Sequence, residues 1–291
     1  MGEKVITSDF VSCIVHFGRA MQSAVRVSAD ASLTEYRVLS YLDQHGEGVT
    51  PGKIAEALGL TGGSVSPAMG RLLEKVLVDA RISSENSSSY TAVITERGRR
   101  KLEQCDKALL LAYDDFFEPL SEDLLASLLS GSVVTSSFLG VTRMNGSSYF
   151  AENSVLTGFL RNEQYFTNTT RNHGLSLGEF RVLQLLSEHP SMGCQKSLQE
   201  YLIAHKSELS GWCKSLETKG LVSRRRDLRD GRRSLLALTA QGFQKLEETR
   251  RDIDISLVRP AQPAEIVLFN DMFHIIMEQK RESGRAAGHQ P

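Results

Sequence analysis

The sequence has few of the residues that mark metal-bound, disulfide-bonded or membrane proteins. Its four cysteines are far apart, with no C-x-x-C pair and no histidine at zinc-ligand spacing, which excludes a disulfide framework and a common zinc site. The N-terminal apolar run from Val11 to Val15 is too short for a signal peptide or a membrane span. We therefore expect a cytoplasmic protein with reduced thiols and no membrane partner.

The chain also lacks an excess of charge of either sign. Lysine and arginine total 34 against 35 aspartates and glutamates, a net charge of −1. This balance excludes a uniformly basic, histone-like protein, so any surface that binds nucleic acid must be a local patch.

Motifs of common enzymes are absent. There is no G-x-x-x-x-G-K, G-x-S-x-G or H-E-x-x-H sequence and no paired carboxylates, and the segment from Thr61 to Ser64 lacks the lysine of a phosphate-binding loop. We expect neither catalysis nor a cofactor.

What the chain does contain is an internal repeat. Ser32 to Leu39 matches Ser176 to Leu183 at an offset of 144 residues, and the same offset holds without a gap beyond Gly98 and Gly242. The sequence therefore predicts two copies of one unit, 1–144 and 145–291, and 41% hydrophobic residues suffice for a core in each.

Each copy is predicted to contain a helix-turn-helix. Ser32 with Glu35, and Ser176 with Glu179, have the spacing of a capping box at a helix start. Short helices are expected next, over 53–58 and 197–204. In the second copy a further helix follows that buries Leu209, Cys213 and Leu216 and exposes Lys206, Ser207, Ser210 and Lys214.

A basic hairpin is predicted from Leu221 to Thr239, with Asp230-Gly231 as its tight turn. It carries six arginines against two aspartates, a charge that suits phosphates but also an ordinary solvated loop. Long helices are expected to flank the copies, with breaks at Pro119 and Pro260: 10–26, 154–170, 99–129 and 240–280. The fold class is therefore mainly α with small β-wings.

With the segments Leu216-Glu217-x-x-Gly220-Leu221-Val222-x-Arg224, Asp227-x-x-Asp230-x-Arg232 and Leu238-Thr239-x-x-Gly242, the chain resembles the MarR family of transcription regulators. These proteins dimerise through terminal helices, so the resemblance implies two winged helix-turn-helix units in tandem, similar to a dimer fused into one chain. It further implies binding to double-stranded DNA and a repressor that a small ligand releases.

The two copies are not equal in charge. Residues 203–234 hold nine basic and four acidic residues, a net charge of +5, whereas residues 59–90 have a net charge of zero and place Pro67 inside the expected recognition helix. The predicted DNA contacts therefore lie in the second copy: Lys206, Ser207, Ser210, Lys214, Arg224, Arg229, Arg232 and Arg233. By resemblance, Arg232 would enter the minor groove. One chain on an asymmetric site and two chains on a palindrome both remain open.

Effector binding and two other functions complete the expectations. MarR relatives often bind a small, frequently aromatic acid between the helical region and the winged domain. Such a pocket could be lined by His16, Arg19 and Tyr36 in the first copy, and by Arg161, Tyr165 and Phe180 in the second. Aromatics at this spacing are also common in cores. The alternatives are a regulator that binds ligand or protein with little DNA binding, and a redox sensor that uses Cys13.

Overall fold

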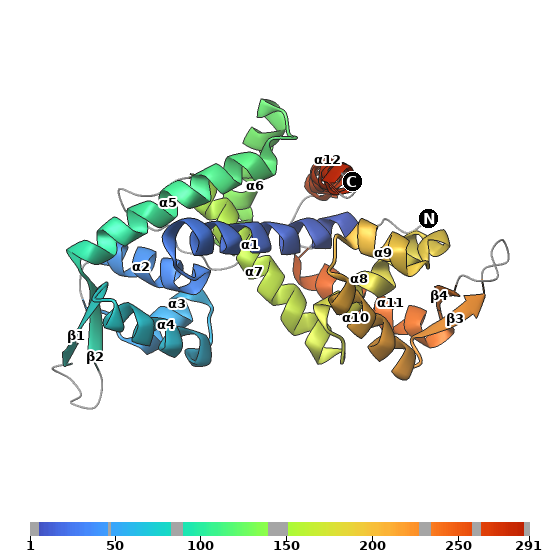
Figure 1. Ribbon diagram of the computed structural model, residues 1–291, viewed down its shortest axis with the longest axis horizontal. Helices are drawn as coiled ribbons and strands as arrows, with labels where there is room; N and C mark the ends of the chain where they lie inside the picture. Colours follow the sequence, from blue (N-terminus) through green and yellow to red (C-terminus); the bar gives the residue numbers. More distant parts are fainter. Residues whose placement is uncertain are drawn as a thin grey trace. The chain divides into compact units, whose positions relative to one another are not determined.

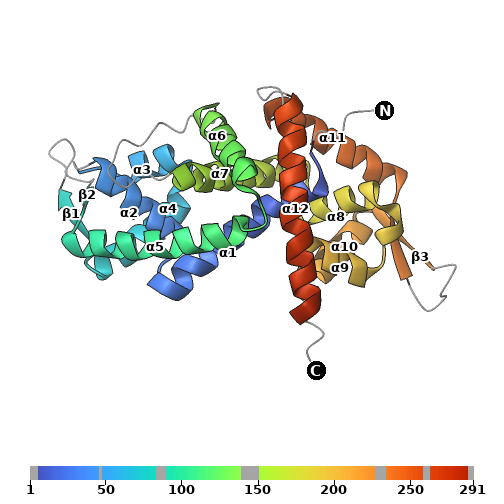
Figure 2. The same cartoon turned by 90° about the horizontal axis from the view of Figure 1, so that it is seen from above.

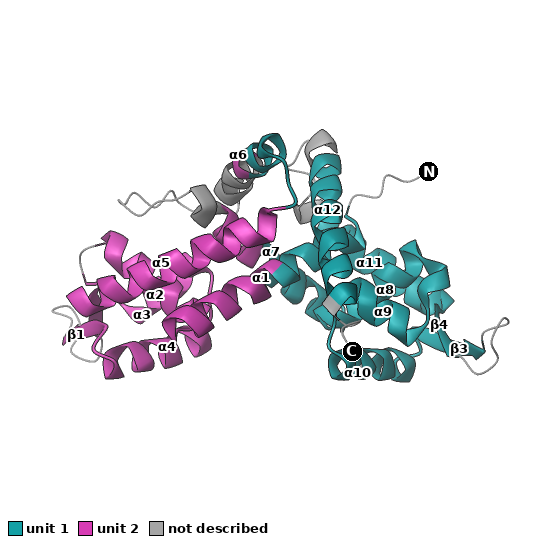
Figure 3. Cartoon of the chain, turned by 45° about the horizontal axis from the view of Figure 1, so that its top comes forward, with its two compact units in different colours: residues 1–16, 119–128, 162–291 teal, residues 17–118, 129–161 magenta. Residues whose placement is uncertain are grey.

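The structure is a computed structural model that describes residues 6–45, 48–82, 90–138, 151–226, 234–257 and 263–287. The chain forms two compact units, coloured separately in Figure 3. Unit 1 comprises residues 1–16, 119–128 and 162–291, and unit 2 comprises residues 17–118 and 129–161. Each unit contains one winged helix-turn-helix, here called the first head (residues 33–94, in unit 2) and the second head (residues 177–238, in unit 1).

The first head follows the predicted order of elements (Figure 1). It contains α2 (Leu33–His45), α3 (Pro51–Leu58), α4 (Gly62–Glu74), β1 (Val78–Ile82) and β2 (Tyr90–Ile94), and α5 (Glu96–Phe117) follows it. The predicted capping box is confirmed, because the Glu35 carboxylate accepts from the Ser32 amide at 2.7 Å and Ser32 Oγ accepts from the Glu35 amide at 3.1 Å. The local sequence thus fixes where α2 begins.

The second head repeats this order. It contains α8 (Leu177–Glu188), a 3₁₀ turn η1 (Pro190–Met192), α9 (Gln195–Leu202), α10 (Lys206–Thr218), β3 (Val222–Arg226) and β4 (Ser234–Leu238), and α11 (Ala240–Leu257) follows it. The capping box of Ser176 and Glu179 is present here as well. The short helix begins two residues earlier than predicted, at Gln195, because Cys194 has the extended backbone of an N-cap residue.

Four long helices complete the units: α1 (Ser8–Ala29), α6 (Glu122–Phe138), α7 (Ala151–Asn172) and α12 (Pro263–Ala287). The predicted break at Pro119 is confirmed, since α5 ends at Phe117 and α6 begins at Glu122. Pro260 lies outside the described residues. Helices α1 and α7 each contribute residues to both units, so they change colour along their length in Figure 3.

Each wing is a two-stranded antiparallel sheet. Val78 pairs with Ile94 in the first, and Val222 pairs with Leu238 in the second. The helix after each wing starts against it: a Cβ on Gly98 would lie 2.1 Å from the Leu77 carbonyl oxygen, and one on Gly242 would lie 1.9 Å from that of Leu221. This close approach explains why both copies have Thr-x-x-Gly at this position. The predicted Asp230-Gly231 turn lies outside the described residues.

Aromatic side chains from distant segments form the core of each unit. In unit 2, the ring centroid of Phe17 lies 5.2 Å from that of Phe116 and 4.6 Å from that of Phe159. In unit 1, the centroid of Phe10 lies 4.9 Å from that of Phe273 and 6.4 Å from that of Phe166. Each core therefore takes side chains from both halves of the sequence. The predicted boundary at 144/145 stays a prediction, because residues 139–150 lie outside the described ranges.

Candidate nucleic-acid interface

The face of α10 that points away from the core carries the predicted recognition residues. Leu209, Cys213 and Leu216 are buried, as the periodicity predicts. The opposite face exposes Lys206, Ser207, Ser210 and Lys214. The His205 amide donates to the Glu208 carboxylate at 3.3 Å, which satisfies one of the free amides at the start of the helix. This face is basic and hydroxyl-bearing, which suits DNA bases and phosphates.

Gln195, at the first position of α9, makes a contact that the sequence did not predict. Its Nε2 donates to Ser210 Oγ at 2.7 Å, so it joins the first helix of the helix-turn-helix to the exposed face of the second. The contact fixes the rotamer of Ser210 and places an amide beside the predicted DNA-facing side chains. Only the fold reveals the pair, because the two residues are 15 positions apart.

The wing residue Arg224, predicted as a DNA contact, is ion-paired with Glu217 of α10. Two arginines that were not among the predicted contacts, Arg225 and Arg226, are exposed at the end of β3. Arg229, Arg232 and Arg233 lie outside the described residues, so their roles stay predictions. Within the described part of the wing, Arg225 and Arg226 are therefore the arginines available to phosphates.

Lys219, counted in the basic charge of the second copy, is also engaged within the fold. Its Nζ donates to the Glu179 carboxylate at 2.7 Å and to the Gly174 carbonyl oxygen at 2.9 Å. Burial raises the pKa of Glu179, but the hydrogen bonds from Lys219, the Ser176 amide and Ser215 outweigh it and hold that pKa below its usual value. Lys219 thus stabilises the start of α8.

The first head presents a different surface at the corresponding place. Helix α4 exposes Gly63, Ser66 and Gly70, and it contains Pro67 within its length. Arg71, the basic residue of this helix, is ion-paired with the buried Glu35. The difference in charge predicted between the two copies is therefore present at the exposed faces of the two recognition helices.

The six predicted effector residues are divided between the units. Arg19, Tyr36 and Arg161 belong to unit 2, and His16, Tyr165 and Phe180 belong to unit 1. Several of them make contacts within the fold. The Tyr36 hydroxyl donates to Asp106 at 3.0 Å, the Tyr165 hydroxyl donates to the Asp252 carbonyl oxygen at 3.0 Å, and Phe180 is buried. The effector pocket therefore stays a prediction.

Cationic side chains lie at the C-terminal ends of α3 and α9. In unit 2, Arg37 donates to the Leu58 carbonyl oxygen at 2.7 Å and Arg161 donates to that of Ala57 at 2.8 Å. Burial and the neighbouring Arg161 lower the pKa of Arg37 to about 10. The negative end of the α3 dipole favours these cations.

Unit 1 repeats the arrangement with other partners. Arg181, buried at the position that corresponds to Arg37, donates to the Leu202 carbonyl oxygen at 2.7 Å and to Ser12 Oγ at 3.1 Å. His16 Nε2 lies 3.0 Å from the same carbonyl oxygen. The match of Arg37 with Arg181 in the repeat was a signal that could have revealed this cap.

Cys13 does not have the surroundings of a redox-sensing thiol. Its side chain is fully buried, and burial raises the pKa of the thiol well above its ordinary range. Because the thiolate is the reactive form, burial and the raised pKa both disfavour reaction at Cys13. Among the described residues there is no cluster of histidine, cysteine, aspartate or glutamate that could hold a metal ion, and no helix is both long and apolar enough to cross a membrane.

Comparison with known proteins places these heads among transcriptional regulators. Residues 30–86 match the MarR family, and residues 164–249 match the family described as transcriptional regulator SarA/Rot. An uncharacterized HTH-type transcriptional regulator of Bacillus subtilis, YdgJ, is 34% identical over 79 residues, which are 27% of this chain and 48% of that protein. The match therefore spans about half the length of that relative.

Two solved structures of regulators are among those similar to part of this chain. The apo form of MarR from E. coli is 18% identical, with a TM-score of 0.37 over 40% of this chain and 85% of that one. CouR from Rhodococcus jostii RHA1, solved bound to p-coumaroyl-CoA, is 20% identical, with a TM-score of 0.36 over 42% of this chain and 83% of that one. The first head thus overlaps a match to the MarR family and the second a match to the SarA/Rot family of transcriptional regulators, and both have the winged helix-turn-helix order of elements.

Proposed function

We propose that the second head binds double-stranded DNA and that the chain acts as a repressor. The observation that carries this proposal is the set of exposed basic residues on α10 and at the end of β3, namely Lys206, Lys214, Arg225 and Arg226. A helix of this kind enters the major groove, while the wing follows the backbone. Phosphate contacts from its lysines and arginines would supply most of the affinity.

We further propose that recognition within one chain is unequal. The exposed positions of α4 are mostly glycine, serine and proline, and its one arginine, Arg71, is ion-paired with Glu35, so the first head would contribute little to affinity. A single chain would then bind an asymmetric site, with the first head as a helical partner of the second. Two chains on a palindrome remain the alternative arrangement, and the stoichiometry of the DNA complex distinguishes the two.

A small aromatic acid is the effector class that we propose for release of DNA. The regulator CouR binds p-coumaroyl-CoA, an aromatic acyl thioester. In this chain, cationic and aromatic side chains occur together among the predicted effector residues, Arg19, Tyr36 and Arg161 in unit 2 and His16, Tyr165 and Phe180 in unit 1. In unit 2, Arg19 and Arg161 would offer a cation for a carboxylate and Tyr36 a ring; in unit 1, Tyr165 and Phe180 would offer rings and His16 a polar imidazole.

A matched pair of substitutions tests the proposal. Arg225 in the second wing and Arg81 in the first are separated by the repeat offset of 144 residues, and both are exposed. Binding of the DNA upstream of the gene is measured by fluorescence anisotropy over a range of salt concentrations. Arg225→Ala should lower the slope of log affinity against log salt by about 1, because one phosphate contact is lost, whereas Arg81→Ala should leave it unchanged. If both substitutions lowered the salt slope equally, the proposal that the two heads contribute unequally would be wrong. If the wild-type chain did not bind this DNA, the proposed DNA-binding function would be wrong.

A further inference from the structure

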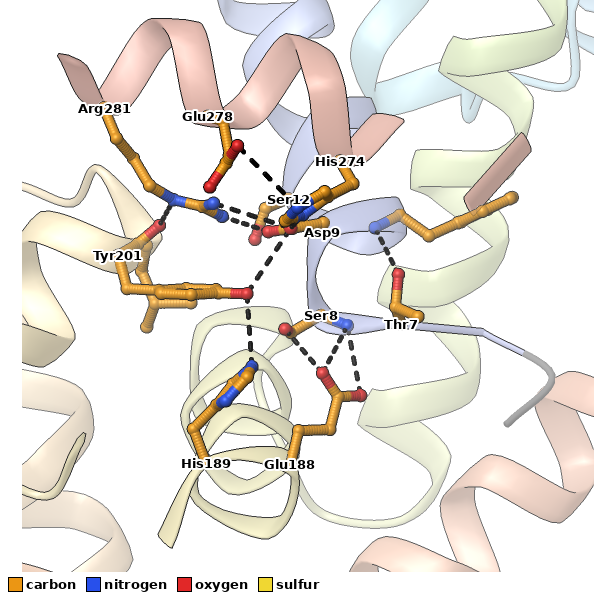
Figure 4. A network of polar contacts seen from close by, with 12 residues as sticks. Thr7, Ser8, Asp9, Ser12, Glu188, His189, Tyr201, His274, Glu278 and Arg281 are labelled. Carbon is orange, nitrogen blue, oxygen red and sulfur yellow. Dashed lines mark hydrogen bonds and ion pairs between the residues drawn. The ribbon is translucent and has the colours of Figure 1, made fainter. Parts of the chain in front are cut away.

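A buried polar network joins the N-terminal turn of α1 to α9 and α12 within unit 1 (Figure 4). Its centre is Asp9, which is only 3% exposed. The Asp9 carboxylate accepts from the guanidinium of Arg281 and from His274 Nδ1 at 2.7 Å, both on α12. It also accepts from the Tyr201 hydroxyl of α9 at 3.4 Å. One carboxylate thus holds donors from two other helices.

Arg281 makes further contacts with the same tyrosine. Its Nε donates to the Tyr201 carbonyl oxygen at 3.1 Å, and its guanidinium carbon lies 3.7 Å from the centroid of the Tyr201 ring. A guanidinium at this distance over a ring is attracted to the ring face, more strongly where water is excluded. The long helix α12 packs against α9 (Figure 2). Through Arg281 it therefore contacts both the main chain and the ring of Tyr201.

The network extends to the end of α8. The Tyr201 hydroxyl lies 3.4 Å from His189 Nε2. The Ser8 amide and hydroxyl donate to the Glu188 carboxylate at 3.0 and 2.7 Å, and Arg250 Nη2 donates to the same group at 3.2 Å. Both helices that precede α10 are therefore anchored by side chains of α1.

The central residues of this network occur once in the chain. At the repeat offset of 144, the positions of Asp9, Tyr201 and Arg281 hold Asn153, Ala57 and Ser137. None of these equivalent positions holds one of the three groups on which the network depends. The network therefore coincides with the head that has the basic surface, and it is absent by sequence from the neutral one.

We infer that Arg281 is a positioning residue for DNA binding by the second head, an inference that rests on the proposed function. Helix α9 packs against α10. Gln195 of α9 also donates a hydrogen bond to Ser210 on the exposed face of α10. Because Arg281 holds Tyr201 on α9, it determines where α10 presents its basic face. Arg281 does this from α12, outside the residues predicted to contact DNA.

The experiment replaces Arg281 in the full chain. Arg281→Met keeps the length of the side chain and removes its charge and donors. We expect DNA affinity to fall roughly tenfold, within the range typical of coupling between sites, with the salt slope unchanged because no phosphate contact is lost. Arg281→Lys keeps the cation over the Tyr201 ring and should recover part of this loss. Arg251→Met, at an exposed arginine of α11, is the control for the same change in net charge.

Loss of folded protein is separated from loss of positioning by two measurements. Titration at DNA concentrations far above the dissociation constant gives the fraction of active protein, and the emission of Trp212, the single tryptophan of the chain, reports on α10 itself. Asp9→Asn is the second variant, with nearly the same shape as the wild-type side chain. If both variants have a wild-type dissociation constant after correction for active protein, the positioning role is wrong. If wild-type protein binds no DNA, the proposed function is wrong instead.

Discussion

The indole of Trp212 on α10 lies directly against the backbone of Gly178 on α8. A Cβ built on Gly178 would be 2.0 Å from Cε2 of the ring, well inside van der Waals contact. The recognition helix therefore rests on α8 through a ring that only glycine can accommodate. At the repeat offset the first head has Thr34 and Ala68 at these positions, so the contact is specific to the second head.

Replacement of Gly178 by alanine should displace this ring. We expect a loss of about 1–3 kcal/mol in the free energy of unfolding, as for an overpacked core, together with a shift in Trp212 emission and weaker DNA binding. Gly211→Ala is the control, because a Cβ there meets nothing within 4 Å and alanine favours a helix. Urea unfolding followed by fluorescence measures both. Equal stability of Gly178→Ala and wild type would contradict the contact.

The stability of unit 2 should depend on pH through Asp106. Burial raises the pKa of its carboxyl from 3.8 to about 6, although the hydrogen bond from Tyr36 opposes the shift. Because the folded-state pKa is the higher one, the favourable contribution is complete below 3.8 and is lost as pH rises through about 6. The free energy of unfolding of Asp106→Asn should therefore increase relative to that of the wild type as pH rises. The increase should be on the order of 1 kcal/mol after allowance for partial exposure.

Denaturant unfolding at several pH values tests this prediction, with the exposed Asp114→Asn of the same helix as control. The difference between Asp106→Asn and wild type should grow from about pH 4 to about pH 7 and then level off. The difference for Asp114→Asn should stay flat. A flat difference for both variants would show that ionisation of Asp106 costs nothing.

Pro67 gives a third prediction. It lies inside α4 and is exposed, so it removes an amide that could donate to the Gly63 carbonyl oxygen one turn earlier. Pro67→Ala should stabilise unit 2 by about 1–3 kcal/mol. It should leave DNA affinity unchanged if, as proposed, the first head contributes little to binding. Thermal unfolding, with the neighbouring Ser66→Ala as control, measures the first effect, and lower stability of Pro67→Ala would contradict it.

The local features of the fold could be predicted from sequence because they depend on neighbouring residues. The capping boxes of Ser32 and Ser176, the break at Pro119 and the buried face of α10 are all confirmed. The predicted position of Pro67 inside the recognition helix is confirmed as well, because α4 begins at Gly62 and includes it.

The partners of charged side chains could not be predicted in the same way. A count of charges makes Lys219 and Arg224 part of the DNA-binding surface, but the fold brings Glu179 and Glu217 beside them. Arg225 and Arg226 have the same sequence surroundings and remain exposed. Which arginine is neutralised depends on which carboxylate the tertiary structure brings near, and no local pattern contains that information.

The division of α1 between two units affects which fragments of the chain can fold and how mutations map onto the two copies. By sequence, Phe10 and Asp9 belong to the first copy, but Phe10 packs against Phe166 and Phe273, and Asp9 contacts a tyrosine 192 positions away. A fragment that starts after the repeat boundary would lack part of its own core. A substitution near the start of the gene would therefore act on the second head, so a linear map of mutations would assign it to the wrong copy.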